Sequence, residues 1–221
     1  MAHLQQSLRA HLRGSLASLW EVHGFALFGV DGSRIELPRT QSHEECYSPR
    51  RRSRKRTGKR RHRPLASTHE LKANTPQMWL TMLWHAGTGL PWGWRIGPAD
   101  SSEREHWLEM IPELPENALV AADAGFVGYE YARALLDSGR HLLLRVGANV
   151  RLLRKLGTTR ESGNTVYLWP RYAQPFERPL KLRLVVGHNG KHPIYLVTSV
   201  GSLHRLSDRQ ILDIYRRALG Y

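Results

Sequence analysis

Two aspartates follow short buried strands, a position at which carboxylates bind metal ions in α/β proteins. Asp31 comes after the apolar run "FALFGV" and before a glycine, and Asp123 comes after "ALVAA" and before "AGF". A carboxylate just past the carboxyl end of a strand is held at the sheet edge where ligands bind. Two such groups on adjacent strands would share Mg²⁺ or Mn²⁺, which prefer oxygen ligands and keep open positions for phosphate. The alternative is that each aspartate only begins a turn, as Asp-Gly often does.

Hydrophobic spacing predicts the elements that position these aspartates. Residues 25–30 read as a strand closed by the turn "DGS" and followed by a second short strand, "RIEL". Residues 77–97 read as two strands around a "GTGLP" turn, and residues 101–110 as the start of a helix with glutamate in its first turn. Residues 117–146 then give strand, helix and strand, the layout of a βαβ crossover.

The two ends of the chain are predicted to be helical. Residues 4–20 place leucines at four-residue spacing, which predicts an amphipathic helix that docks on the core of the protein. Residues 207–219 have the spacing of a second helix, with Ser207 or Asp208 as the N-cap. Between them, residues 148–200 alternate β-rich runs with Gly, Pro and Asn turns, which predicts a small β insertion.

The positive charge of the chain is concentrated in one tract. The 221 residues carry a net charge of +14, and residues 50–63 hold ten Arg or Lys and no acid. Without that tract, 23 basic residues face 19 acidic ones. Ten like charges repel one another, so we expect a loop or arm that neutralises phosphates; the alternative is a solvated loop without a partner. The basic residues are Arg50, Arg51, Arg52, Arg54, Lys55, Arg56, Lys59, Arg60, Arg61 and Arg63.

Composition excludes several classes of protein. With 41% hydrophobic residues the chain has an ordinary globular composition, and no apolar run approaches the length needed to span a bilayer. We therefore expect a cytoplasmic protein without a membrane partner. The single Cys46 excludes an internal disulfide, and no Cys/His spacing of a zinc site is present.

Four segments together resemble a known family. "FALFGVDGS", "ALVAADAGFVGYEYARALL", "LLLRVGANV" and "IYRRALGY" are similar, in that order, to segments of DDE transposases from bacterial insertion sequences. The branch concerned has a ribonuclease-H-like core with a β insertion before its last catalytic helix. The resemblance covers about residues 25–221, and its most specific part is the "DAGF" segment.

The resemblance implies an α/β fold with a mixed sheet flanked by helices, divided into four parts. They are an N-terminal helix (1–24), the catalytic core (25–147, with a basic loop at 48–64), the β insertion (148–200) and the start of the last catalytic helix (201–221).

The resemblance also implies the chemistry. Asp31 and Asp123 would be the first two catalytic carboxylates, and two Mg²⁺ or Mn²⁺ ions would support phosphodiester hydrolysis and strand transfer in DNA transposition. The partners would be transposon ends and target DNA, with the protein as a homodimer on DNA. Tyr215, Arg216 and Arg217 would contact DNA near the site, although arginines in a last helical turn are equally explained by the helix dipole.

The third carboxylate of the family falls at position 222, one position beyond the sequence. Tyr215 matches the start of the motif, but Ala218 stands where the family has arginine. Asp213 would be about half a turn out of phase with position 222, and Asp208 about 21 Å back along the helix. We therefore expect a C-terminally truncated transposase that folds and binds DNA but has little catalytic activity. Two alternatives remain: a non-catalytic DNA-binding protein or regulator of an intact transposase, and a metal-dependent nuclease using only Asp31 and Asp123.

Overall fold

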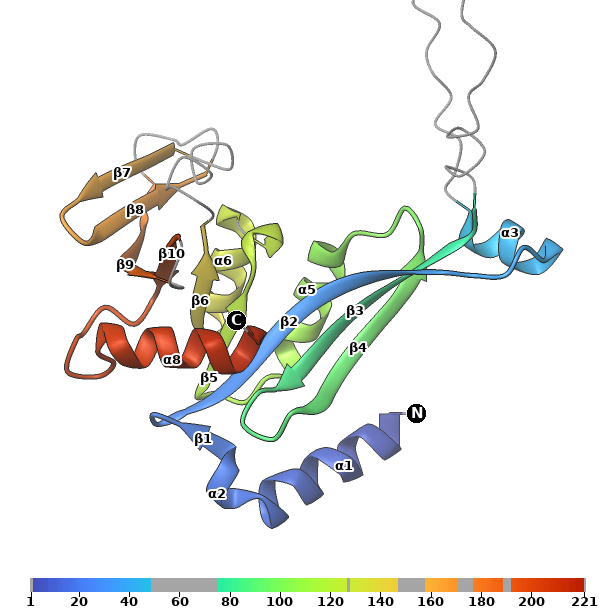
Figure 1. The fold of residues 1–221 in the computed structure, drawn as a ribbon, viewed down its shortest axis with the longest axis horizontal. Coiled ribbons are helices and arrows are strands. Elements are labelled where there is room, and N and C mark those ends of the chain that lie inside the picture. Colours follow the sequence, from blue (N-terminus) through green and yellow to red (C-terminus); the bar gives the residue numbers. More distant parts are fainter. Residues whose placement is uncertain are drawn as a thin grey trace, which may run out of the picture.

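The computed structural model describes residues 2–48, 75–126, 128–146, 158–170, 177–188 and 192–220 (Figure 1). Among them, ten strands form one sheet, in the order β4-β3-β2-β5-β6-β10-β9-β8-β7, with β1 beside β2. In chain order the strands are β1 (Glu21–Val22), β2 (Phe25–Glu36), β3 (Gln77–His85), β4 (Leu90–Pro98), β5 (Ala118–Ala122), β6 (His141–Arg145), β7 (Thr158–Ser162), β8 (Thr165–Trp169), β9 (Leu180–His188) and β10 (Pro193–Thr198).

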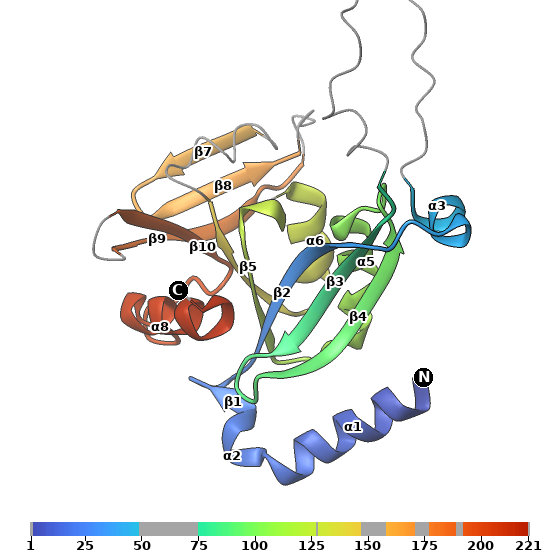
Figure 2. The same ribbon diagram turned by 45° about the vertical axis from the view of Figure 1, so that its right-hand side comes forward.

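The helices lie on both faces of this sheet. They are α1 (Ala2–Ser15), α2 (Ala17–Trp20), α3 (Gln41–Tyr47), α5 (Glu103–Met110), α6 (Tyr129–Asp137) and α8 (Asp208–Leu219), with 3₁₀ turns η1 (Ile111–Glu113) and η2 (Ala124–Phe126). Figures 1 and 2 show α5 and α6 on one face and α8 on the other.

The central strands have the ribonuclease-H-like topology. β2, β3 and β4 are an antiparallel meander, and β5 and β6 then run parallel to β2, joined by the crossover helix α6. The predicted hairpin over 77–97 and the predicted crossover over 117–146 are both confirmed. The parallel pairing sets the carboxyl end of β5 beside the middle of β2, because Val30 is in register with Ala122.

The predicted turn at "DGS" is wrong. Residues 25–36 form one continuous strand, so Asp31, Gly32 and Ser33 lie within β2. The reason is that β3 pairs with β2 without interruption from Phe28 to Glu36, which supplies hydrogen-bond partners that a local turn would forfeit. Asp31 is therefore held within β2 by its pairing with Met82 of β3.

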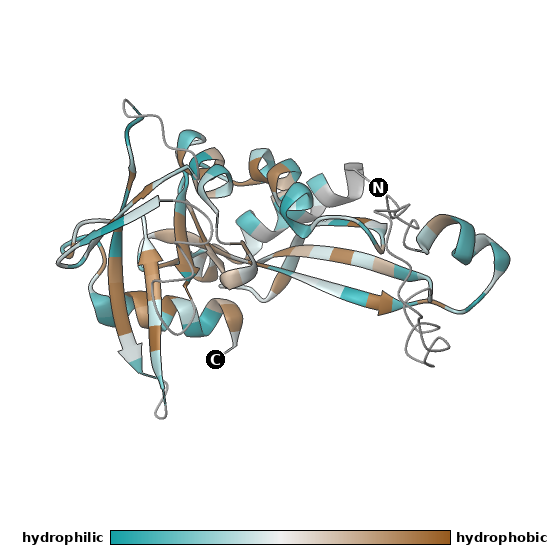
Figure 3. Cartoon of the chain, turned by 90° about the horizontal axis from the view of Figure 1, so that it is seen from above, coloured by the Kyte–Doolittle hydropathy of each residue, from teal (hydrophilic) through white to brown (hydrophobic). Residues whose placement is uncertain are grey.

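Two hydrophobic cores sandwich the sheet. Alternate residues of β2 and β5 point to opposite faces, so Phe28 and Val120 pack under α5 and α6 while Leu27 and Leu119 pack under α8. Figure 3 shows the central strands carrying mostly hydrophobic residues, whereas the helices mix both kinds. The two cores hold the sheet between its helices and thus fix the positions of β2 and β5.

The strands between β6 and α8 extend the same sheet. β10 pairs antiparallel with β6, and β9, β8 and β7 follow outward as an antiparallel series. The inserted β segment is thus hydrogen-bonded to the core through β6, and it leads the chain back to α8.

Helix α8 begins and ends with well-formed caps. Ser207 is the N-cap and shares a capping box with Gln210, which confirms one of the two predicted caps. Gly220 ends the helix in the left-handed conformation, with φ of 73°. The last turn contains Arg216 and Arg217, where positive charge favours the helix dipole.

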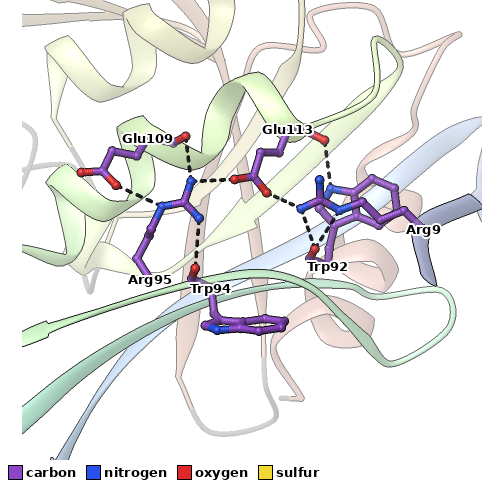
Figure 4. Close-up of polar contacts among 6 residues, drawn as sticks. All are labelled: Arg9, Trp92, Trp94, Arg95, Glu109 and Glu113. Carbon is purple, nitrogen blue, oxygen red and sulfur yellow. Dashed lines mark hydrogen bonds and ion pairs between the residues drawn. The ribbon is translucent and has the colours of Figure 1, made fainter. Parts of the chain in front are cut away.

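Helix α1 docks on the core through a polar anchor. The Arg9 guanidinium donates to the Trp92 carbonyl over 2.8 and 3.0 Å and also pairs with Glu113 (Figure 4). Glu113 accepts a second bond from Arg95, 2.6 Å away, and Arg95 also reaches Glu109 over 3.0 Å. The expectation that the N-terminal helix docks on the protein itself is thus met by ion pairs around one carboxylate.

The basic tract, residues 50–63, lies outside the described residues. No helix in the described part of the chain is long and apolar enough to cross a membrane.

Candidate active site

Asp31 lies within β2, and Asp123 directly follows β5, the parallel strand that pairs with β2. Their preceding residues, Val30 and Ala122, are Cα partners in the β2–β5 ladder, so the two aspartates follow in register on strands that are about 4.8 Å apart. Asp31 is exposed and Asp123 is half-buried. The structure therefore brings together the two carboxylates that the sequence singles out.

Each aspartate is oriented by its own backbone. Asp31 Oδ1 accepts the N–H of Gly32 over 2.8 Å, and Asp123 Oδ1 accepts the N–H of Ala124 over 2.6 Å. Within the described residues the second oxygen of each group accepts no hydrogen bond. One oxygen of each group thus fixes the direction of the carboxylate.

The turn after Asp123 is held from two sides. The Phe126 N–H donates to the Asp123 carbonyl over 3.0 Å, and the Phe126 ring is buried in the core under α5 and α6. Arg104, in the first turn of α5, donates its Nε to the Gly125 carbonyl over 2.8 Å. The aromatic residue of "DAGF" therefore anchors the turn, and Arg104 clamps it from outside.

A third carboxylate lies next to the pair. The two glycines that follow the aspartates, Gly32 and Gly125, make room for Glu103 of α5. A Cβ added at Gly32 would overlap Glu103 Oε2, and one added at Gly125 would lie 3.1 Å from Glu103 Oε1. Because neither glycine has a side chain, the Glu103 carboxylate fits beside both of them.

The charges of this site act on one another. Burial raises the pKa of Glu103, and the negative charges of Asp31 and Asp123 raise it further, while Arg104 and Arg34 oppose this. The described residues contain no group of three or more His, Cys, Asp or Glu side chains arranged to hold one metal ion together. Glu103 is therefore a neighbour of the pair and not a shared third ligand in this arrangement.

Sequence reasoning missed Glu103 and Arg104. Both stand in "SSEREHW", where the sequence shows only a helix N-terminus, because a Ser cap and acids in the first turn are common there. The proximity of α5 to Gly32 in β2 and to the turn after β5 arises only from packing. The glycine that follows each aspartate is the one sequence signal that another group approaches the backbone closely there.

The predicted DNA contacts on α8 differ in exposure. Tyr215 is 1% exposed and lies in the core between α8 and the sheet, so its ring faces the protein interior. Arg216 and Arg217 are exposed, and Arg217 pairs with Asp213 over 2.9 Å. Asp213 also contacts His23 over 3.1 Å, and Asp208 lies 3.7 Å from Arg183. Asp208 and Asp213 of α8 thus each lie within ion-pair distance of a basic residue.

A family model described as "Transposase DDE domain" matches residues 26–217. This match covers most of the chain, including both aspartates. The chain belongs to the transposase DDE domain family.

A solved structure also matches this DDE transposase domain. It is the cryo-EM structure of piggyBac transposase in a synaptic complex with hairpin DNA, 14% identical, with a TM-score of 0.40. The alignment covers 97% of this chain and 45% of that one, so this chain spans less than half of that transposase's length. No curated protein matches the chain.

Proposed function

We propose that this DDE transposase domain performs metal-dependent cleavage and joining of DNA phosphodiester bonds, with Asp31 and Asp123 as its first two catalytic carboxylates. The observation that carries the proposal is the pairing of β2 with β5, which aligns two carboxylates from distant parts of the chain. Family membership supplies the class of reaction, and the geometry supports the choice of residues.

The donor set suits a hard divalent cation. Asp31 and Asp123 offer carboxylate oxygens, the ligands that Mg²⁺ and Mn²⁺ prefer, and Asp31 is exposed while Asp123 is half-buried. A bound cation, or two as in an intact relative, would activate a water or a DNA 3′-hydroxyl and stabilise the leaving oxygen. The chain itself holds the two carboxylates in fixed directions through the Gly32 and Ala124 N–H groups.

Positive charge around the two aspartates would hold the DNA. The basic tract of residues 50–63 would neutralise phosphates without reading sequence, and Arg216 and Arg217 would add contacts near the end of α8. The burial of Tyr215 supports a packing role for that residue and leaves the two arginines as the α8 candidates. Assembly as a homodimer on DNA forms part of the same proposal.

Metal binding tests the proposal directly. Asp31→Asn and Asp123→Asn keep the backbone hydrogen bond of each side chain but remove its charge, so both variants should fold normally. Titration with Mn²⁺, followed by electron paramagnetic resonance of the free ion, should show binding to the parent chain that each variant weakens at least tenfold. Asp137→Asn, an exposed carboxylate on α6, is the matched control and should bind like the parent. Unchanged Mn²⁺ binding in both Asp31→Asn and Asp123→Asn would refute the assignment.

A further inference from the structure

Glu103 lies against Gly32 and Gly125, which follow the two aspartates, and it has no assigned function. It occupies the first position of α5, directly after the N-cap Ser102, whose side chain accepts the N–H of Glu105. A capped helix start restricts the backbone of Glu103, so its carboxylate is directed by α5 and not by a loose loop. The placement is thus a property of the packed fold.

The carboxylate fills the space that two glycines leave. Its Oε2 is too close to Gly32 for a Cβ to fit there, and its Oε1 would lie 3.1 Å from a Cβ on Gly125. Gly32 follows Asp31 directly, and Gly125 is two residues after Asp123. The negative charge is therefore placed beside backbone that lies within two residues of each proposed metal ligand.

The negative charge of Glu103 is electrostatically unfavourable near Asp31 and Asp123 when no cation is present. Val30 packs under α5 and α6, so alternation along β2 directs Asp31 to the α8 face while Glu103 lies across the strand on the α5 face. Three ionised carboxylates close together repel one another. A divalent cation at Asp31 and Asp123 would remove the repulsion.

We propose that Glu103 is a positioning residue of the metal site, whose carboxylate strengthens divalent cation binding at Asp31 and Asp123 without ligating the ion together with them. The inference rests on the proposed function, because it requires those aspartates to bind the cation. Arg104, the next residue, ties α5 to the Gly125 carbonyl and so holds the charge at a fixed distance from the site.

Glu103→Gln tests the charge without changing the shape of the side chain. Removing one negative charge near a doubly charged ion should weaken Mn²⁺ binding roughly fivefold to tenfold. The metal-free variant should be at least as stable to heat as the parent, since it loses a repulsion. The rise in melting temperature on adding Mn²⁺ should be smaller than in the parent. A purely structural residue would instead lower the metal-free melting temperature and leave the Mn²⁺ affinity alone.

Two further variants complete the experiment. Glu105→Gln removes an exposed charge from the same helical turn and should bind Mn²⁺ like the parent. Gly32→Ala introduces the Cβ that overlaps Glu103 Oε2, so it should displace the carboxylate and weaken binding to a similar extent as Glu103→Gln. Combining the two substitutions should weaken binding no further than either alone.

The outcomes separate this inference from the proposed function. If Asp31→Asn and Asp123→Asn abolish Mn²⁺ binding while Glu103→Gln binds like the parent, the inference is overturned and the metal site stands. If the parent chain binds no Mn²⁺, or the aspartate variants bind it unchanged, both proposals fall.

Discussion

Single residues in this domain are explained by the groups that surround them. His85 is fully buried, and its ring stacks on Trp20 at 4.4 Å between ring centres. Its Nε2–H donates to the Trp20 carbonyl over 2.9 Å, which leaves Nδ1 to accept from the Thr88 N–H over 3.3 Å. The Thr88 hydroxyl also lies 3.1 Å from Nδ1, so the neutral ring is satisfied on both nitrogens.

The burial of His85 makes stability depend on pH. Burial lowers its pKa, although the bond to the Trp20 carbonyl opposes the shift. A histidine with a lowered folded pKa stabilises the fold above its unfolded pKa of about 6.5, and this stability is lost as pH falls through the folded pKa. The protein should therefore be easier to unfold at pH 5 than at pH 7.5.

Urea unfolding of His85→Gln at these two pH values measures that contribution. The substitution should cost about 1–2 kcal/mol at pH 7.5, because it removes buried contacts, and should reduce the loss between pH 7.5 and pH 5. His188→Gln, at an exposed site on β9, should leave the pH dependence as in the parent. An equal pH dependence in parent and His85→Gln would contradict this account.

At the scale of elements, the N-terminal helix α1 is attached to the rest of the protein by charged groups. Glu113 is about one-fifth exposed and is shared by Arg9 of α1 and Arg95 of β4. The Arg9 guanidinium also lies over the Trp92 ring, 4.8 Å from its centre. One carboxylate therefore links the N-terminal helix to the meander.

Glu113→Gln should loosen this attachment. Burial alone would raise the pKa of Glu113, but the hydrogen bonds from Arg95 and Arg9 lower it. Its contribution is therefore present above the unfolded glutamate pKa of about 4.3 and is lost as pH falls through the lower folded value. We expect a loss of about 1–3 kcal/mol at pH 7 and faster amide exchange in α1. Exposed Glu116→Gln is the control, and equal stability of both variants would exclude the anchor.

At the scale of the whole molecule, the distribution of charge predicts how DNA is bound. Outside residues 50–63 the basic and acidic residues nearly balance, whereas residues 50–63 carry ten positive charges. Binding through such a tract releases counterions, so the logarithm of affinity should fall linearly with the logarithm of salt concentration, with a slope of about −0.9 per phosphate neutralised.

Replacing Arg60, Arg61 and Arg63 with glutamine should weaken DNA binding and make the slope shallower. Replacing the same three residues with lysine keeps the charge and should keep the slope close to that of the parent. Fluorescence anisotropy with a short duplex over a range of NaCl concentrations measures both. A slope that is the same in the glutamine variant and the parent would exclude the tract from the interface.

The sequence by itself determined the order of the elements and singled out the two candidate catalytic aspartates. Alternating hydrophobic runs predicted β3, β4, β5 and β6 because strand periodicity is a local property. Asp31 and Asp123 stood out because each follows an apolar run, and family resemblance predicted their shared role.

Only the tertiary structure decided how these pieces meet. It made β2 continuous through Asp31, because β3 satisfies its backbone along the whole length. It also buried Tyr215 and brought Glu103 against Gly32 and Gly125. These outcomes depend on strand pairing and helix packing between residues far apart in the chain, and local spacing holds no record of such contacts.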